Sequence, residues 1–261
     1  MFNGLSPARR RLFTLVGALV AVLVVSGVGV LVAQQVGGAS FADQSLPGPV
    51  IVVPGYGGNV SSLDPLVAEL RREGRDVVVF QPTDGGTGDL RIEARGLADL
   101  ADQVMKKADA PSVDVVGYSA GGVVARLYVR DEGGAPVVRR VLTLGSPQHG
   151  TDVAQLATDT VGSCPTACQQ LATDSDLIRQ LNAGDESPSG PRWVTLRSSS
   201  DRLVTPTATA SLKGAVDVLV QDLCPGLTTS HGELPGDPVV LATLHSALGR
   251  GAPRAPTGVS C

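Results

Sequence analysis

Short runs of Val, Ile and Leu alternate with stretches of helical periodicity from Pro49 onward, and this alternation restricts the fold more than any other feature. The apolar runs are continuous, which is typical of strands in a parallel sheet that helices cover on both faces. Two of the helical stretches end at glycine residues, which commonly terminate helices. The sequence therefore predicts an α/β fold with a mostly parallel central sheet and helices on both faces. The expected strands are 50–53, 77–80, 113–116, 137–144, 193–196 and 216–220, and the expected helices are 63–73, 90–108, 121–132 and 238–248.

The third apolar run ends at a serine flanked by glycines. Residues 113–122 read Val-Asp-Val-Val-Gly-Tyr-Ser-Ala-Gly-Gly, so Ser119 lies on a turn between an expected strand and an expected helix. A nucleophilic serine on such a turn needs neighbours without Cβ atoms, because strand and helix approach each other closely there. In a chain with 32 Gly the short pattern is weak support by itself. The assignment therefore depends on the partners of the serine.

A histidine in a suitable place could activate this serine by taking its proton. In folds with such a turn, the order along the chain is serine, acid, histidine. His231 lies in a loop after the last expected strand, where it can reach the carboxyl edge of the sheet. His149 comes before any suitable acid, and His245 lies inside the last expected helix. We therefore predict His231 as the base and expect His149 to shape a turn near the site.

The acid that orients the histidine is predicted to be Asp201. It follows the expected strand 193–196, in a loop at the same edge as the serine. Three competing aspartates are less suitable: Asp217 lies inside a strand pattern, Asp222 stands beside a cysteine, and Asp237 precedes a helix as an N-cap. The alternative interpretation of Asp201 is an ordinary turn aspartate.

The glycine-rich loop after the first strand is the second expected part of the site. Acyl transfer places negative charge on the former carbonyl oxygen, so backbone N–H groups must already point there. We expect these donors to be Ala120, which follows the serine, and Tyr56 in the loop 53–58, Val-Pro-Gly-Tyr-Gly-Gly. The loop lacks the Gly-x-Gly-x-x-Gly register and a following Lys-Ser or Lys-Thr, which argues against nucleotide binding. No cofactor is expected.

The amino-terminal part predicts export across a membrane. Arg9, Arg10 and Arg11 precede an uncharged run at 12–33, and its roughly 22 residues are enough to cross a bilayer as a helix. We expect residues 1–36 to be a retained signal anchor or a cleaved signal peptide, with the arginines in the cytoplasm and the rest outside. The small residues of 37–48 predict a flexible linker, and 49–261 the folded domain.

Four cysteines agree with an extracytoplasmic location. An even number in an exported chain predicts disulfides, although three pairings are possible. Proximity favours Cys164 with Cys168, and Cys224 with the terminal Cys261. Zinc is the alternative, but Cys-x3-Cys without a nearby histidine is a poor zinc motif, so no metal is expected.

Residues 150–190 interrupt the strand–helix rhythm. They contain the close cysteine pair, helical patches at 151–157 and 175–181, and a polar stretch rich in Gly, Pro and Ser. A long connection at the carboxyl edge of a parallel sheet often covers the ligand site, so we expect a cap-like insertion, with a purely structural excursion as the alternative. The net charge of −4 argues against nucleic acid as a partner.

Five motifs occur along the chain: Pro-Gly-Tyr-Gly-Gly (54–58), Gly-Tyr-Ser-Ala-Gly-Gly (117–122), Leu-Gly-Ser-Pro-Gln-His-Gly-Thr (144–151), Ser-Asp-Arg-Leu-Val-Thr-Pro (200–206) and Ser-His-Gly-Glu-Leu (230–234). In combination they resemble the small bacterial lipases and esterases, the class 2 type of triacylglycerol lipases, in the α/β-hydrolase superfamily. The resemblance extends over about residues 49–250. It departs from the commonest form of the family at Pro54, where a histidine usually stands.

The resemblance implies an α/β-hydrolase fold and a catalytic triad of Ser119, Asp201 and His231. It also implies hydrolysis of carboxylic esters, with acylglycerols or other lipid esters as substrates. We expect a lipid or small ester substrate, contact with the membrane through the amino-terminal helix, and a monomer. Two alternatives stay open: an acyltransferase that uses the same triad, and a catalytically silent domain that binds components of the cell envelope.

Overall fold

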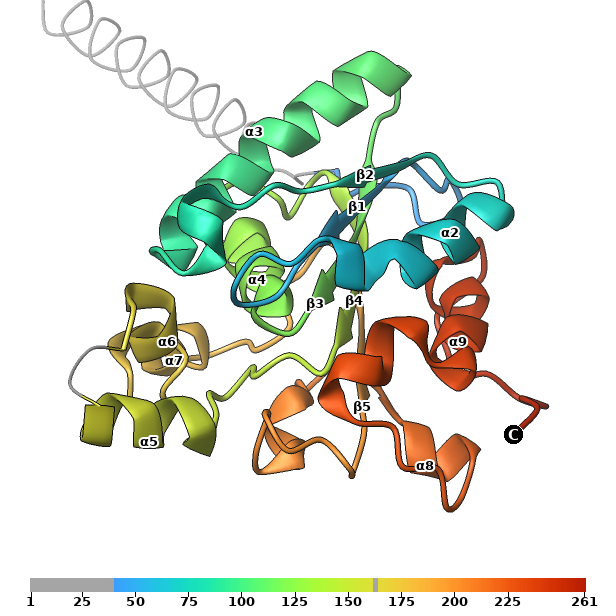
Figure 1. The fold of residues 1–261 in the computed structure, drawn as a ribbon. Helices are drawn as coiled ribbons and strands as arrows, with labels where there is room; N and C mark the ends of the chain where they lie inside the picture. Colours follow the sequence, from blue (N-terminus) through green and yellow to red (C-terminus); the bar gives the residue numbers. More distant parts are fainter. Residues whose placement is uncertain (1–39, 162–163) are drawn as a thin grey trace, which may run out of the picture. The chain divides into compact units, whose positions relative to one another are not determined.

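Six parallel strands form one sheet in the computed structural model, which describes residues 40–161 and 164–261. The strand order is β2-β1-β3-β4-β5-β6, so the chain crosses over between β2 and β3 and then runs steadily toward one edge (Figure 1). Such parallel order requires helical crossovers, which agrees with the expected alternation of strands and helices. The strands are β1 (Val50–Val53), β2 (Val77–Val79), β3 (Val113–Tyr118), β4 (Val138–Leu144), β5 (Arg192–Arg197) and β6 (Val216–Leu219).

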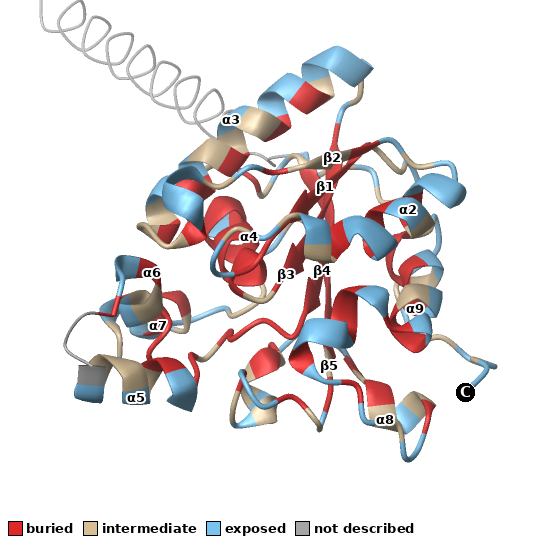
Figure 2. Cartoon of the chain, viewed as in Figure 1, coloured by how far each residue is buried: buried red, intermediate tan, exposed pale blue. Residues whose placement is uncertain are grey.

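Helices cover both faces of this sheet, as predicted. On one face α3 (Leu90–Ala108) and α4 (Ala120–Asp131) pack over side chains such as Val115 of β3. On the other face α2 (Asp64–Arg72) and α9 (Pro238–Leu248) pack over Val116, the next residue of the same strand. Figure 2 shows the result: the central strands β1, β3 and β4 are buried, and the outer sides of α2 and α3 are exposed.

Short helices fill the connections. The expected cap at 150–190 contains two helices near the predicted patches and one that was not predicted, α6, because five residues are too short to show a period. The short helices are η1 (Ser61–Leu63), η2 (Thr83–Gly86), α5 (Asp152–Val161), α6 (Thr166–Gln170), α7 (Asp176–Leu181), η3 (Thr207–Ala210), α8 (Val220–Leu223) and η4 (His231–Gly236).

The expected flexible linker at 37–48 is wrong for its second half. The described unit begins at Phe41, and Arg139 donates to the carbonyl of Gln44 while Arg75 donates to that of Gly48. These backbone carbonyls are fixed by the guanidinium groups of a buried and a partly buried arginine, so this stretch belongs to the folded unit. The expected signal anchor at 1–36 lies outside the described residues. Within 40–161 and 164–261, no helix combines the length and the apolar character that a membrane span requires.

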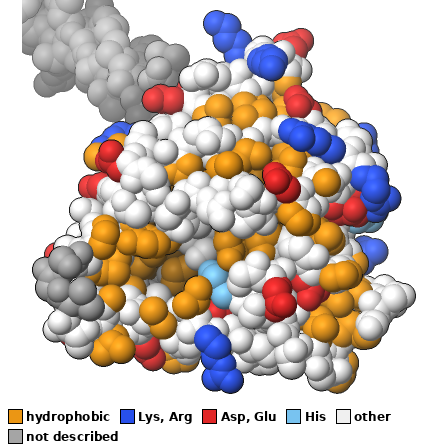
Figure 3. All heavy atoms as spheres, viewed as in Figure 1, with side chains coloured by type: hydrophobic (Ala, Val, Ile, Leu, Met, Phe, Trp, Pro, Cys, Tyr) orange, Lys and Arg blue, Asp and Glu red, His pale blue; other side chains and the backbone are white. Residues whose placement is uncertain are grey.

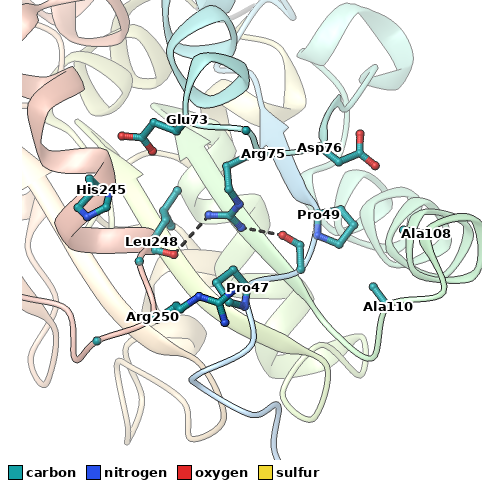
Figure 4. A pocket seen from close by; sticks show the side chains of 14 residues that line it. Pro47, Pro49, Glu73, Arg75, Asp76, Ala108, Ala110, His245, Leu248 and Arg250 are labelled. Carbon is teal, nitrogen blue, oxygen red and sulfur yellow. Dashed lines mark hydrogen bonds between the residues drawn. The ribbon is translucent and has the colours of Figure 1, made fainter.

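At the edge of the sheet where the strands begin, the segment before β1 and the end of α9 are joined by an ion-pair cluster. The buried carboxylate of Asp114 accepts hydrogen bonds from Arg75 and Arg139, each at 2.5 Å. Both arginines also donate to the carbonyl of Leu248 at the end of α9. An open cavity of about 930 Å³ lies here, lined among others by Arg75 and His245 (Figure 4). It is at the edge opposite to the carboxyl ends of the strands.

Candidate active site

Ser119 lies between the end of β3 and the start of α4, as predicted, in a backbone conformation that is rare for residues other than glycine. Its φ is +53° and its ψ is −127°. The turn is so tight that a Cβ atom on Gly117 would lie 2.5 Å from the Cα of Gly122, and one on Gly121 would overlap the carbonyl of Val53. The glycines are therefore required by close packing, and the serine hydroxyl projects from the turn.

His231 lies beside this serine, at the start of η4. Its Nε2 is 3.0 Å from Oγ of Ser119, and its Nδ1 is 2.6 Å from Oδ2 of Asp201. An ionised carboxylate can only accept a hydrogen bond, so Nδ1 carries the proton and Nε2 is free to accept one from the serine. The structure thus brings together the three residues that the sequence singled out.

Asp201 is held by the loop that follows β5. Its Oδ1 accepts backbone N–H groups of Leu203 at 2.8 Å and Val204 at 2.9 Å. Burial by itself would raise the pKa of Asp201, but the hydrogen bonds from His231 and from these two N–H groups outweigh it and hold the pKa below its ordinary value of 3.8. Asp201 is therefore a permanent anion at neutral pH, which keeps the histidine in one tautomer.

The loop after β1 comes close to the serine from the other side. A Cβ atom on Gly55 would lie 2.8 Å from the Cβ of Ser119, so only glycine fits at this position. Tyr56 follows, and it is 44% exposed. Ala120 is the first residue of α4, and the first N–H groups of a helix have no acceptor within the helix. Tyr56 thus follows the glycine that packs against Ser119, and Ala120 follows Ser119 itself, so both belong to the segments where backbone donors are expected.

The turn η2 packs against the glycine-rich loop 53–58. Gly57 donates its N–H to the carbonyl of Gly86 in η2, and the two loops are in van der Waals contact at Gly58 and Gly86. The start of η2 is fixed by the buried carboxylate of Glu93 on α3, which accepts both the N–H and the hydroxyl of Thr83. Glu93 was not predicted, because it lies within an ordinary helical pattern.

The other two histidines do not take part in the contacts between Ser119, His231 and Asp201. The ring of His149 contacts the carbonyl of Thr209 and the carboxylate of Glu186, each at 3.2 Å, so it links the loop after β4 to η3 and to the end of the segment 150–190. His245 lies on α9 at the amino edge (Figure 4).

The four cysteines form the two pairs favoured by proximity: Cys164 with Cys168 and Cys224 with Cys261. Within the described parts of the chain, no group of three or more His, Cys, Asp and Glu side chains is arranged to hold a metal ion.

Four of the seven large apolar side chains that are exposed in the described residues belong to the segments around the site. They are Tyr56 in the glycine loop, Val153 and Leu156 on α5, and Leu203 in the loop of Asp201. Figure 3 shows a hollow on this face with hydrophobic side chains gathered beside it and a histidine at its edge. The loop of Asp201 and the start of α5 are joined, because Thr151 donates its hydroxyl to the carbonyl of Leu203.

A parallel sheet covered on both faces, with a serine on a strained strand–helix turn and an acid and a histidine from later loops, defines the α/β-hydrolase class. The sequence model of the palmitoyl protein thioesterase family matches residues 49–184, more than half of the chain. The chain therefore belongs to this family of α/β hydrolases. No curated protein sequence matches it.

Solved structures of lipases share the fold. Lipase B of Aspergillus fumigatus superimposes with a TM-score of 0.72 at 22% identity, over 83% of this chain and 56% of the lipase. The mature lipase BlEst2 of Bacillus licheniformis gives 0.57 at 19% identity, over 66% of this chain and 83% of that chain. A protein of Listeria innocua gives a TM-score of 0.57 at 15% identity, over 79% of this chain and 95% of that chain. This chain thus spans little more than half of the length of the fungal lipase.

Proposed function

We propose that this protein is a serine hydrolase that cleaves carboxylic esters through an acyl-enzyme intermediate. The observation that carries the proposal is the continuous chain of contacts from Asp201 through His231 to Ser119, with distances of 2.6 Å and 3.0 Å. Family membership supports the same chemistry, because thioesterases and esterases both transfer an acyl group.

The reaction follows from this geometry. Oγ of Ser119 attacks the carbonyl carbon of the ester while Nε2 of His231 takes the hydroxyl proton. Asp201 stabilises the imidazolium that results. Collapse of the tetrahedral intermediate breaks the bond to the leaving oxygen, which receives the proton from Nε2. Water then attacks the acyl-enzyme by the same steps and releases the carboxylic acid.

The negative charge of the tetrahedral intermediate needs backbone donors. We assign them to the N–H groups of Tyr56 and Ala120, which belong to the two segments that lie against Ser119. Donors that are fixed before the reaction stabilise the developing charge without reorganisation. Pro54 occupies the position where the commonest lipase motif has a histidine. The proposed donor is the backbone N–H of Tyr56, so its role does not depend on the side chain at position 54.

The substrates are proposed to be lipid esters. The exposed side chains of Val153, Leu156 and Leu203 offer apolar surface for an acyl chain beside the site. Thioesters of long acyl chains are the second candidate, and the family to which the chain belongs favours them. Both substrate classes present a carbonyl to the same serine and differ only in the leaving atom.

The protein is proposed to work outside the cytoplasm, attached to the membrane by its amino-terminal segment or secreted after cleavage, and as a monomer. Two disulfides support the oxidising location. They are stable in exported proteins and rare in the cytosol.

The first experiment compares wild type with Ser119→Ala on p-nitrophenyl esters of increasing acyl length and on a palmitoyl thioester. We expect the variant to lose hydrolysis by at least about 10³-fold, since nothing else supplies the nucleophile. The control is Ser199→Ala, which changes an exposed serine and should keep full activity.

Two further measurements separate the alternatives. A fluorophosphonate probe should label wild type at Ser119 and leave Ser119→Ala unlabelled; folded wild type without label would favour a silent binding domain. Product analysis with glycerol as a competing acceptor distinguishes hydrolase from acyltransferase. Acyl glycerol as the main product would contradict hydrolysis as the principal reaction.

A further inference from the structure

Tyr118, the residue before the candidate nucleophile, is a buried polar side chain that the reaction above does not use. It is the last residue of β3 and is paired with Leu144 of β4, so strand geometry fixes its backbone. Its side chain points to the face of the sheet that packs against α2, α9 and η4, and only 9% of it is exposed. The tyrosine therefore lies beneath the loop that carries His231.

Two contacts connect this tyrosine with the histidine. The phenol hydroxyl donates a hydrogen bond of 3.0 Å to the main-chain carbonyl of His231. The two rings also pack together, with centroids 5.2 Å apart and planes inclined by 34°. Tyr118 thus contacts both the backbone and the ring of the histidine.

The hydrogen bond matters because His231 is carried by a loop and not by a strand. The residues before it have no regular structure, and η4 begins at His231 itself. Asp201 and Ser119 contact the ring of the histidine through its two nitrogen atoms. Tyr118 connects the histidine backbone to β3, the same strand that positions Ser119.

We propose that Tyr118 is a positioning residue: its hydroxyl and ring fix the distance between His231 and Ser119, so that strand β3 sets the position of both the nucleophile and its base. This inference rests on the proposed function, since it assigns a role in the proton transfer from Ser119 to His231.

The state of the phenol suits this role. Burial, with a smaller contribution from the negative charge of Asp201, raises the pKa of Tyr118 to about 12. The hydroxyl therefore stays protonated and remains a donor at every pH at which an ester hydrolase is assayed. The ring also offers an aromatic surface within about 6 Å of the imidazolium that forms during the reaction, which is favourable.

The test is Tyr118→Phe, which keeps the ring and removes the hydroxyl. The variant leaves the buried carbonyl of His231 without its donor. We expect kcat to fall about tenfold, which corresponds to about 1.4 kcal/mol, and KM to change less than about twofold. The rate of Ser119 labelling by a fluorophosphonate should fall in proportion, because the same proton transfer limits it. Tyr118→Leu, which also removes the ring, should lose more than Tyr118→Phe.

The matched control is Tyr128→Phe. Tyr128 is a buried tyrosine with 2% exposure on α4, on the opposite face of the sheet, so its substitution removes a hydroxyl from the core without touching the triad. We expect its kcat and labelling rate to stay at the wild-type level even where its thermal midpoint falls. Titration of active sites with the probe gives kcat for each competent molecule, which removes the effect of any misfolded fraction.

Three results would overturn the inference: a kcat of Tyr118→Phe within twofold of wild type, a raised KM at unchanged kcat, or a lowered kcat with an unchanged labelling rate. A wild type that neither hydrolyses esters nor labels at Ser119 would contradict the proposed function itself. The two failures are therefore distinguishable.

Discussion

Asp201 illustrates how single side chains define this site. One carboxylate oxygen orients His231, and the other accepts the N–H groups of Leu203 and Val204. The backbone bonds fix the carboxylate and leave its second oxygen free for the histidine. Because these hydrogen bonds replace solvent, the carboxylate stays ionised. An ionised Asp201 can then stabilise the imidazolium of His231.

Asp201→Asn should therefore reduce activity strongly with little change in fold. An amide nitrogen at the position of Oδ2 would donate to Nδ1 and favour the tautomer whose Nε2 cannot accept the serine proton, so kcat should fall about 10³- to 10⁴-fold. The control is Asp217→Asn on β6, which breaks a partly exposed ion pair with Arg197 away from the triad and should keep kcat. Equal losses in the two variants would contradict the assignment.

The same residue predicts how stability depends on pH. The pKa of Asp201 is lower in the folded state than its ordinary value of 3.8, so its ionised form stabilises the fold above that pH. This contribution is lost as the pH falls through the folded-state pKa. Thermal midpoints of wild type and Asp201→Asn should therefore differ most near neutral pH and converge below about pH 4. A constant difference across this range would contradict the lowered pKa.

At the scale of residues, the sequence singled out Ser119, Asp201 and His231, whose side chains lie together in the structure, because chain order and loop positions restrict the choice. It did not predict the contact of Tyr118 with His231, which joins residues 113 positions apart. A sequence pattern places both residues at the carboxyl edge of the sheet, but only the path of the loop decides which backbone carbonyl a tyrosine hydroxyl reaches.

Among the elements, η2 determines the position of the proposed oxyanion loop. Its residues Gly85 and Gly86 both have positive φ, of +61° and +69°. They differ in their surroundings: a Cβ atom on Gly86 would lie 2.7 Å from the backbone N of Gly58, whereas one on Gly85 would meet nothing within 4 Å. The two glycines therefore form a matched pair for mutation.

Gly86→Ala should displace the loop of Tyr56 and reduce kcat, because a backbone donor that moves no longer matches the developing oxyanion. We expect a loss of about 10- to 100-fold, somewhat less than removal of a donor. Gly85→Ala introduces similar backbone strain without the clash and should reduce stability but keep kcat. Circular dichroism and steady-state kinetics on both variants measure this difference, and an equal kcat would show that η2 does not support the site.

The strands and long helices were predictable, because their hydrophobic periods extend over enough residues. The support from η2 was not, since Thr83–Gly86 is an irregular turn in which Asp84 also has a positive φ of +48°. Residues 41–48 look like a linker by composition. They are ordered by Arg75 and Arg139, whose distant positions in the sequence carry no local signal.

On the scale of the whole molecule, the two disulfides close loops of very different length. Cys164 and Cys168 are separated by 4 positions within the cap, whereas Cys224 and Cys261 are separated by 37 and enclose η4 and α9. A longer closed loop restricts the unfolded chain more, so the carboxyl-terminal pair should stabilise the fold more.

Removing each pair should separate these contributions. By chain entropy, the double substitution Cys224→Ala with Cys261→Ser should lower the free energy of unfolding by about 4 kcal/mol, and the double substitution Cys164→Ser with Cys168→Ser by about 2 kcal/mol. Denaturant titration without reductant measures both. A larger loss from the cap pair would mean that the cap, and not the loop around η4, limits stability.

Ser119 combines a required side chain with an unfavourable backbone. A residue with a Cβ atom at φ +53° costs about 1–3 kcal/mol, and a glycine would adopt the same turn without that cost. The residue that stability favours at this position is therefore not the residue that chemistry needs. Selection for thermal stability alone would therefore favour glycine at position 119. Among descendants of this protein, a glycine there would mark a lineage that has lost the reaction and kept the fold.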